Sequence, residues 1–439
     1  MPLAFSDLSK KLTKSLSKDD KKNGGIFFTP PACVADIISR LRAFEQKQNR
    51  AFETILEPSC GSGEFISALA HEYPRANITG VEYNHDIYSE VSQHFSAVTN
   101  VRIQHGDFLT YASPADPAAA DPAPDLIIGN PPYYVMKKEE VAPEYHPFFD
   151  GRPNIFILFI IKSAKLLREN GVLCFVLPSS FMNSQYYDKT RKYIVRHFSI
   201  LHIAKCDSGG YLETQQPTFV LIIQKRSPSL VLDDDHDDYD AVATTATTTI
   251  EGCSGGVFEK SGATIFTYDL PRMLQLYAGS RSLHELGFNV TVGTVVWNQC
   301  KDILTHDSTK TRLIYSSNIE NGKFVHKTYK NAEKKAFIDK PSGGDGAPMI
   351  VLNRGYGVGK YHFEYCLITP ETVSSNEYLI ENHLLYITRN TDADADMPFE
   401  RIIRSFQDPR TLEFIACYCA NNAMNTTELI HMLPIYYDI

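Results

Sequence analysis

The residues best suited to chemistry form the sequence Asn130-Pro131-Pro132-Tyr133, directly after a predicted buried strand at 125–129. Proline lacks a backbone N–H and fixes its own φ angle, so two prolines in succession make a rigid, extended turn. In such a turn the side-chain carbonyl of Asn130 and the backbone carbonyl of Pro131 can act as two acceptors aimed at one point. An amino group conjugated to a planar ring needs such a pair of acceptors before its nitrogen becomes nucleophilic. Tyr133 offers a face on which the ring can stack, although an ordinary proline-rich turn would have the same sequence.

A second candidate lies upstream, in the glycine-rich sequence at 57–63. It joins a predicted strand to a predicted helix, and Gly61 and Gly63 would let the backbone N–H groups near Cys60 approach a ligand. The sequence lacks the third glycine of a pyrophosphate-binding fingerprint, and a carboxylate, Glu57, precedes the turn. A carboxylate at this place suits an ammonium group better than a phosphate. A tight strand–helix turn without a ligand is the alternative interpretation.

Two further acids end the next two predicted strands. Glu82, 19 residues beyond Gly63, stands where an acid can accept hydrogen bonds from both hydroxyls of a ribose. Asp107 could accept a hydrogen bond from the exocyclic amine of an adenine, while Phe108 presents an apolar edge to the ring. Each acid alone could be a solvated strand-end or turn residue. Together they favour an adenosine-containing cofactor, because open α/β sheets bind ligands at the carboxyl ends of their strands.

These positions require a sheet that brings successive strand ends together. Short apolar runs alternate with helical patterns between residues 26 and 226, which is typical of an α/β fold with a doubly wound parallel sheet. The last predicted strand arrives late in this series, which suggests an added and antiparallel strand. The predicted strands are 54–57, 77–82, 101–105, 125–129, 172–177, 200–205 and 218–224, and the predicted helices are 64–72, 86–95, 155–169 and 187–198, besides one opened by Thr29-Pro30-Pro31.

Composition divides the chain into four parts. Residues 1–25 are a polar, lysine-rich lead-in, and 26–226 form the α/β domain. Residues 227–262 are rich in aspartate and threonine and have the composition of a linker. Residues 263–439 form a second, mixed α+β domain, whose topology does not follow from the sequence.

The acidic net charge of -9 is concentrated in three stretches, 112–125, 231–240 and 391–397. They hold twelve aspartates and no Lys or Arg, so the rest of the chain carries +3. We interpret all three as solvated loop insertions. The mildly basic remainder permits a surface that binds nucleic-acid phosphates but does not demand one.

Cysteine usage and hydropathy predict a cytoplasmic protein. The nine cysteines include no C-x-x-C pair, which together with the lack of a signal-peptide pattern predicts reduced thiols. No run of about 18 apolar residues occurs, so no membrane partner is expected.

With these motifs the chain resembles the gamma class of S-adenosylmethionine-dependent adenine-N6 DNA methyltransferases, the Taq-type enzymes of restriction–modification systems. In that class a Thr-Pro helix, a glycine loop, an NPPY element and a C-terminal target-recognition domain follow one another. The same order appears here at 28–31, 57–63, 130–133 and after 262. The resemblance extends over 24–226 by motif and over 263–439 by position and size alone. It implies a Rossmann-like methyltransferase sheet followed by a target-recognition domain.

The resemblance also implies a role for each matching position. Glu82 would hold the cofactor's ribose, and Asp107 and Phe108 its adenine. In the family a second aromatic residue stacks on the other face of the target base, and Tyr211, seven residues before Thr218, takes that place here, where the family usually has Phe. An exposed loop tyrosine is the alternative for Tyr211. The remaining implied roles are methionine binding by Thr29, Glu57 and the backbone at Cys60, Gly61 and Gly63, binding of the target amine by Asn130 and Pro131 beside the cofactor, and base stacking by Tyr133.

The expected reaction is methyl transfer from S-adenosylmethionine to the N6 amine of an adenine flipped out of a specific duplex DNA sequence. It needs no metal, and a cytosine-C5 enzyme is rejected because the chain has no Pro-Cys dipeptide. Two other enzymes remain open: an RNA adenine-N6 methyltransferase and a protein-glutamine N5 methyltransferase, although the latter lacks a large domain after its core. A non-enzymatic nucleic-acid binder with a decayed pocket would be expected to lose Asn130 or Glu82. Both residues are present, which argues against this alternative. We expect a monomer that binds double-stranded DNA, and the resemblance allows a partner restriction endonuclease.

Overall fold

The computed structural model consists of two compact units, Met1–Leu270 and Pro271–Ile439. It describes residues 4–17, 21, 24–111, 122–206, 217–230, 243–245, 254–340, 346–354, 363–390, 397–418, 424 and 426–436. The break between the units lies at Leu270, whereas the sequence suggested a boundary after residue 262. The two differ because a strand pair at 256–267 belongs to the first unit.

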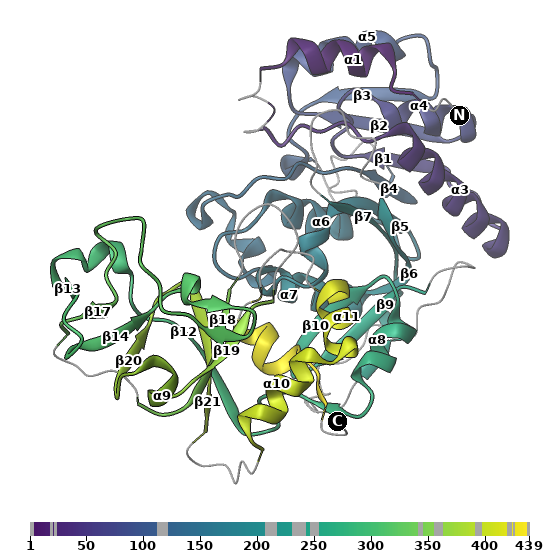
Figure 1. The fold of residues 1–439 in the computed structure, drawn as a ribbon. Coiled ribbons are helices and arrows are strands. Elements are labelled where there is room, and N and C mark those ends of the chain that lie inside the picture. Colours follow the sequence, from purple (N-terminus) through teal and green to yellow (C-terminus); the bar gives the residue numbers. More distant parts are fainter. Residues whose placement is uncertain are drawn as a thin grey trace. The chain divides into compact units, whose positions relative to one another are not determined.

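A seven-stranded sheet forms the centre of the first unit (Figure 1). Its strands lie in the order β3-β2-β1-β4-β5-β7-β6. The first five strands of that order are parallel, and β7 runs antiparallel to both of its neighbours. The predicted doubly wound sheet and its antiparallel strand are thereby confirmed, with β7 placed inside the sheet. The strands are β1 (Thr54–Glu57), β2 (Asn77–Glu82), β3 (Val101–His105), β4 (Leu126–Gly129), β5 (Val172–Pro178), β6 (Phe198–Cys206) and β7 (Thr218–Lys225).

The sheet is covered on both faces, which is why its central strands β4 and β5 are apolar and buried along their whole length. Neighbouring residues of one strand point to opposite faces. Ile55 therefore packs with the helices of one face and Leu56 with those of the other. None of the helices among the described residues is long and apolar enough to cross a membrane. The helices of the first face are α3 (Pro31–Gln48), α4 (Glu64–Glu72) and α5 (His85–Phe95), and those of the second are α6 (Ile155–Leu166) and α7 (Asp188–His197).

Asp125 anchors the amino ends of β1 and β4. It is 2% exposed, and its Oδ2 accepts hydrogen bonds from the backbone N–H groups of Glu53 and Thr54, both at 2.9 Å. Arg50 and Arg168 pair with its Oδ1. The prediction that the acidic stretch 112–125 is solvated is therefore wrong at Asp125, because these four donors offset the free-energy cost of burying its charge. Residues 112–121 lie outside the described residues.

The predicted polar lead-in contains a packed helix, α1 (Asp7–Ser15). Leu8 and Leu12 are four residues apart and therefore lie on one face of the helix, where both are buried. They belong to the same core cluster as α3, α4 and α5. The alternation of leucines with lysines in this lysine-rich lead-in is the pattern of an amphipathic helix.

The predicted linker at 227–262 holds two strands of a small antiparallel sheet. Strand β8 (Ala243–Thr245) pairs with β9 (Gly256–Lys260), and β9 pairs with β10 (Ala263–Thr267). Val257, Phe258, Ile265 and Phe266 are all buried. Val257 and Phe258 lie within the predicted linker but outside its aspartate and threonine runs, so the average composition of the segment concealed them.

The second unit combines antiparallel and mixed sheets with helices, in keeping with the predicted α+β composition. One sheet has the order β12-β21-β18-β19 and another the order β13-β17-β14-β20. Its strands are β11 (Ser280–Arg281), β12 (Phe288–Val292), β13 (Leu304–Thr305), β14 (Thr311–Ile314), β15 (Ile319–Glu320), β16 (Lys323–Phe324), β17 (Phe337–Ile338), β18 (Met349–Asn353), β19 (Tyr365–Ile368), β20 (Tyr378–Ile380), β21 (Leu384–Arg389) and β22 (Ile435–Tyr436), and its helices are α8 (Leu270–Tyr277), which begins at the boundary, α9 (Pro370–Val373), α10 (Phe399–Gln407) and α11 (Pro409–Tyr418).

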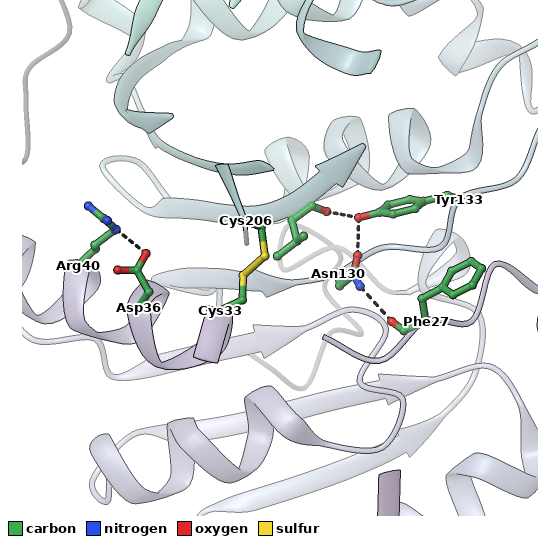
Figure 2. Close-up of a disulfide and its surroundings, with 8 residues drawn as sticks. Phe27, Cys33, Asp36, Arg40, Asn130, Tyr133 and Cys206 are labelled. Atoms are coloured by element: carbon green, nitrogen blue, oxygen red, sulfur yellow. Dashed lines mark hydrogen bonds and ion pairs between the residues drawn. A yellow bond between two sulfur atoms is a disulfide. The ribbon is translucent and has the colours of Figure 1, made fainter. Parts of the chain in front are cut away.

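A disulfide joins Cys33, in the first turn of α3, to Cys206, the last residue of β6 (Figure 2). The two Cα atoms are 6.0 Å apart, although 173 residues separate them in the chain. The prediction that all cysteines are reduced thiols is therefore wrong for this pair, since only the fold brings the two residues together. Cys60, Cys174 and Cys366 are buried free thiols.

Candidate active site

A cavity of about 420 Å³ opens at the carboxyl ends of the central strands of the first unit. The strand order reverses between β1 and β4, and ligands of open α/β sheets bind at such a switch point. Three predicted site residues do not line the cavity themselves but are next in the chain to residues that do: Gly63, Pro131 and Tyr133. Tyr211 lies outside the described residues. The predicted site residues that line the cavity are Thr29, Glu57, Cys60, Gly61, Glu82, Asp107, Phe108 and Asn130.

The glycine loop is tightly folded against the end of β2. The N–H of Cys60 donates to the carbonyl of Val81 at 2.9 Å, and the N–H of Gly63 donates to the carbonyl of Cys60 at 2.8 Å. Gly63 has a φ of 80°, and a Cβ atom there would lie 2.5 Å from the ring of Phe95. This position therefore requires glycine on two counts, a left-handed backbone and a close neighbour.

Glu82 is held by two backbone donors. Its Oε2 accepts from the N–H of Gly61 at 2.9 Å, and its Oε1 accepts from the N–H of Asn84 at 2.8 Å. Burial raises the pKa of Glu82, and these backbone hydrogen bonds oppose the rise. Each carboxylate oxygen can accept more than one hydrogen bond, so both can still receive a ligand hydroxyl.

Glu57 has an unsatisfied oxygen. Its side chain is 2% exposed, and no donor in the described part of the chain reaches its Oε2. Burial, followed by the negative charge of Glu82, raises the pKa of Glu57 well above its ordinary value, while the backbone N–H of Ile66 lowers it. A buried carboxylate without a partner costs free energy, and a bound cation would remove that cost.

The far side of the cavity is apolar. Phe108 is buried, and its ring centroid lies 5.0 Å from that of Phe159 on α6. Asp107 is exposed and accepts a hydrogen bond from the N–H of Leu109 at 2.9 Å. The two residues thus place a carboxylate beside an aromatic surface of the cavity.

The amide of Asn130 is fixed in orientation (Figure 2). Its Nδ2 donates to the carbonyl of Phe27 at 3.0 Å, and the hydroxyl of Tyr133 lies 2.5 Å from its Oδ1. The same hydroxyl lies 2.7 Å from the carbonyl of Val176 on β5. Because one hydroxyl proton serves two acceptors, Tyr133 can donate to Val176 whenever another donor approaches Asn130.

The segment at 24–29 packs directly against the NPPY element at 130–133. Gly25 has a φ of 60°, and a Cβ atom there would lie 2.5 Å from the backbone nitrogen of Tyr133. Thr29, at the end of this segment, is buried and lines the cavity. The segment thus connects the predicted cofactor residue Thr29 with the amide of Asn130.

Several lining residues were missed in the sequence. Ile155 and Phe159 lie four residues apart on α6, a spacing that predicts a shared helix face but not a cavity wall. Tyr83 and Tyr134 each follow a predicted site residue or motif, and both line the cavity. Ser62 and Glu64 stood within or beside the glycine loop and carried no separate signal. Among the described residues, no group of three or more His, Cys, Asp or Glu side chains is arranged to hold a metal ion.

Comparison with known proteins gives relatives for both units. The family model described as Eco57I restriction-modification methylase matches residues 69–210, within the first unit. Type II methyltransferase M.CvrRI of Paramecium bursaria Chlorella virus XZ-6E is 29% identical over 440 residues, which cover 98% of this chain and 99% of the relative. Modification methylase CviBIII of Paramecium bursaria Chlorella virus NC1A is 33% identical over 226 residues, 51% of this chain and 55% of that protein.

Solved structures also align with part of the chain. The type I restriction-modification system methyltransferase subunit from Streptococcus thermophilus has a TM-score of 0.39 and 20% identity, over 46% of this chain and 45% of that one. The match to M.CvrRI, by contrast, extends over both units of this chain.

Proposed function

We propose that this chain, a relative of the type II restriction–modification methyltransferases, transfers a methyl group from S-adenosylmethionine to the N6 amine of an adenine in duplex DNA. The observation that carries the proposal is the position of Asn130. Its amide lines the same cavity as Glu57 and Glu82, so an amine bound by Asn130 would lie beside a cofactor bound by the two acids.

The residues of the cavity fit S-adenosylmethionine. The volume of about 420 Å³ lies within the range of roughly 300–1,000 Å³ of small-molecule sites. The unpartnered Oε2 of Glu57 suits the ammonium of the methionine part, with Thr29, Gly61 and the backbone at Cys60 beside it. Glu82 would accept from the ribose hydroxyls, and Asp107 and Phe108 would receive the adenine. When bound, this cofactor supplies a methyl group on a positively charged sulfur, which needs no metal for its activation.

The NPPY element would hold the target amine. The Oδ1 of Asn130 and the carbonyl of Pro131 would accept its two hydrogens, which draws the nitrogen lone pair away from the ring and towards the methyl group. Tyr133 can keep its hydrogen bond to Val176 while its ring stacks on the base. Together with Tyr211 on the other face, this stacking would offset part of the cost of flipping the adenine out of the duplex, at about 1–3 kcal/mol per stacked base.

The two units would divide the work. Residues 26–226 would carry out methyl transfer, and the residues after the break would recognise the target sequence in double-stranded DNA. A restriction endonuclease that reads the same sequence would be the natural partner of such an enzyme.

The test is transfer of tritiated methyl groups from S-adenosylmethionine to duplex DNA, RNA of the same sequence and a protein extract in parallel, with the full chain. We expect label in duplex DNA, recovered as N6-methyladenine after digestion to nucleosides. Label in RNA alone would make the chain an RNA adenine methyltransferase, and label on glutamine alone would make it a protein methyltransferase. The Asn130→Ala variant serves as the inactive control.

A further inference from the structure

Helix α1 lies against the loop that forms one wall of the cavity. Leu8 and Leu12 bury one face of the helix in the core around α4 and α5. On the exposed side, Lys11 pairs with Glu90 of α5 at 2.6 Å. The helix is therefore a fixed part of the first unit.

Two serines of this region contact the loop directly. Ser9 is fully buried, and its Oγ lies 2.7 Å from the Oγ of Ser62. It also donates to the Oε1 of Glu64 at 2.5 Å. Ser6, at the N-cap of α1, reaches the same carboxylate oxygen with its backbone N–H at 2.9 Å and with its hydroxyl at 2.8 Å. Three donors thus converge on one oxygen of Glu64.

The two partners of Ser9 flank the residue that most needs to be held in place. Ser62 and Glu64 both line the cavity, and Gly63 between them has a left-handed backbone. Glycine has the largest conformational freedom to lose on folding, so the loop has a high entropic cost of order. The hydrogen bonds from Ser9 fix the residues on both sides of Gly63 from outside the cavity.

The same contacts act on the groups that meet the ligand. The N–H of Gly61, next to Ser62, donates to Glu82, and the charge of Glu64 is among those that raise the pKa of Glu57. A shift of Ser62 would therefore act on Glu82, and a shift of Glu64 would act on Glu57. Ser9 touches neither of them and can act only through the loop.

We propose that α1 is a brace for the cofactor loop and that Ser9 is a positioning residue for cofactor binding. The inference rests on the proposed function, since it takes S-adenosylmethionine as the ligand. Loss of the Ser9 hydroxyl leaves the fold intact, because alanine favours a helix and the leucine contacts remain. It loosens the loop before the ligand arrives, so the ligand must then order it.

The test is calorimetric titration of S-adenosylmethionine into the full-length wild type, Ser9→Ala and Lys10→Ala. Lys10 lies on the same helix and, among the described residues, forms an ion pair with Asp7 on the surface, so its variant is the matched control. We expect Ser9→Ala to weaken binding about tenfold, as the loss of a hydrogen bond to a charged group would. Lys10→Ala should bind as the wild type does, and kcat at saturating cofactor should be the same in all three.

Thermal unfolding of the ligand-free proteins checks that Ser9→Ala still folds, as the inference requires. A Ser9→Ala variant with wild-type affinity would overturn the inference, as would a loss of affinity and of kcat together. If Ser9→Ala fails to fold, Ser6→Ala removes one of the donors to Glu64 at a less buried position, and a several-fold loss of affinity is expected there too; unchanged affinity would again overturn the inference. A wild type that binds no S-adenosylmethionine would instead refute the proposed function.

Discussion

Two buried carboxylates lie at opposite ends of neighbouring strands, Asp125 at the amino end of β4 and Glu57 at the carboxyl end of β1. Both are 2% exposed. Asp125 accepts from two backbone N–H groups and pairs with two arginines. Glu57 has one oxygen that no described donor reaches.

Equal burial therefore has different meanings at the two ends of the sheet. A buried carboxylate with all its partners holds the structure together, whereas one without them raises the energy of the fold. The raised pKa of Glu57 reflects this cost. A group kept in such a state is a candidate for ligand binding, because the ligand supplies the missing partner.

Asn130 provides the largest effect with which to test whether the carboxyl end is the reactive one. Asn130→Ala should lower kcat by about 10²–10³-fold, as expected when one hydrogen-bonding group of a reaction site is removed. Cofactor affinity, measured by calorimetry, should stay nearly unchanged, since the acids of the cavity remain. A variant that methylates at the wild-type rate would contradict the mechanism in which the Oδ1 of Asn130 and the carbonyl of Pro131 accept the hydrogens of the target amine.

Asp125→Ala should act on stability instead. Removing this carboxylate leaves the N–H groups of Glu53 and Thr54 without their acceptor and separates two arginines from their partner. The arginines are partly exposed and contribute little, so we expect the free energy of unfolding to fall by about 3 kcal/mol, measured by urea denaturation. The folded fraction should bind cofactor normally. Lost binding with unchanged stability would reverse the assignment of the two acids.

Glu57→Gln should show the opposite pattern. The amide keeps the size of the side chain and an acceptor oxygen but carries no negative charge to pair with an ammonium, so cofactor affinity should fall by about tenfold to a hundredfold. Stability of the ligand-free protein should rise or stay the same, because the folded state no longer buries an unpaired charge. Wild-type affinity in this variant would remove Glu57 from the site.

The pH dependence of stability gives the smallest effect. Because the pKa of Glu57 is higher in the folded state than its ordinary value of 4.5, its protonation stabilises the fold below that value, and this contribution is lost as pH rises through the raised pKa. Glu57→Gln should therefore gain stability over the wild type as pH increases and match it near pH 4. Urea denaturation at a series of pH values measures the difference, and a difference that shrinks as pH rises would contradict the sign.

The sequence predicted the carboxyl end of the sheet better than the amino end. Strand ends and glycines near the cavity have local signals, and β1, β2 and β3 have the predicted bounds. Asp125 was assigned to a solvated stretch because its partners come from residues about 70 positions earlier and from Arg168. The contacts between Ser9 and Glu64 likewise join distant parts of the chain, and no local pattern reveals them.

The bridge between Cys33 and Cys206 encloses most of the cavity's residues in one covalent ring. A protease that cuts once between these cysteines would not divide the polypeptide, since its two fragments would stay tethered through sulfur. On a denaturing gel such nicked protein would migrate as an intact chain until a reductant was added, and only then separate into two bands.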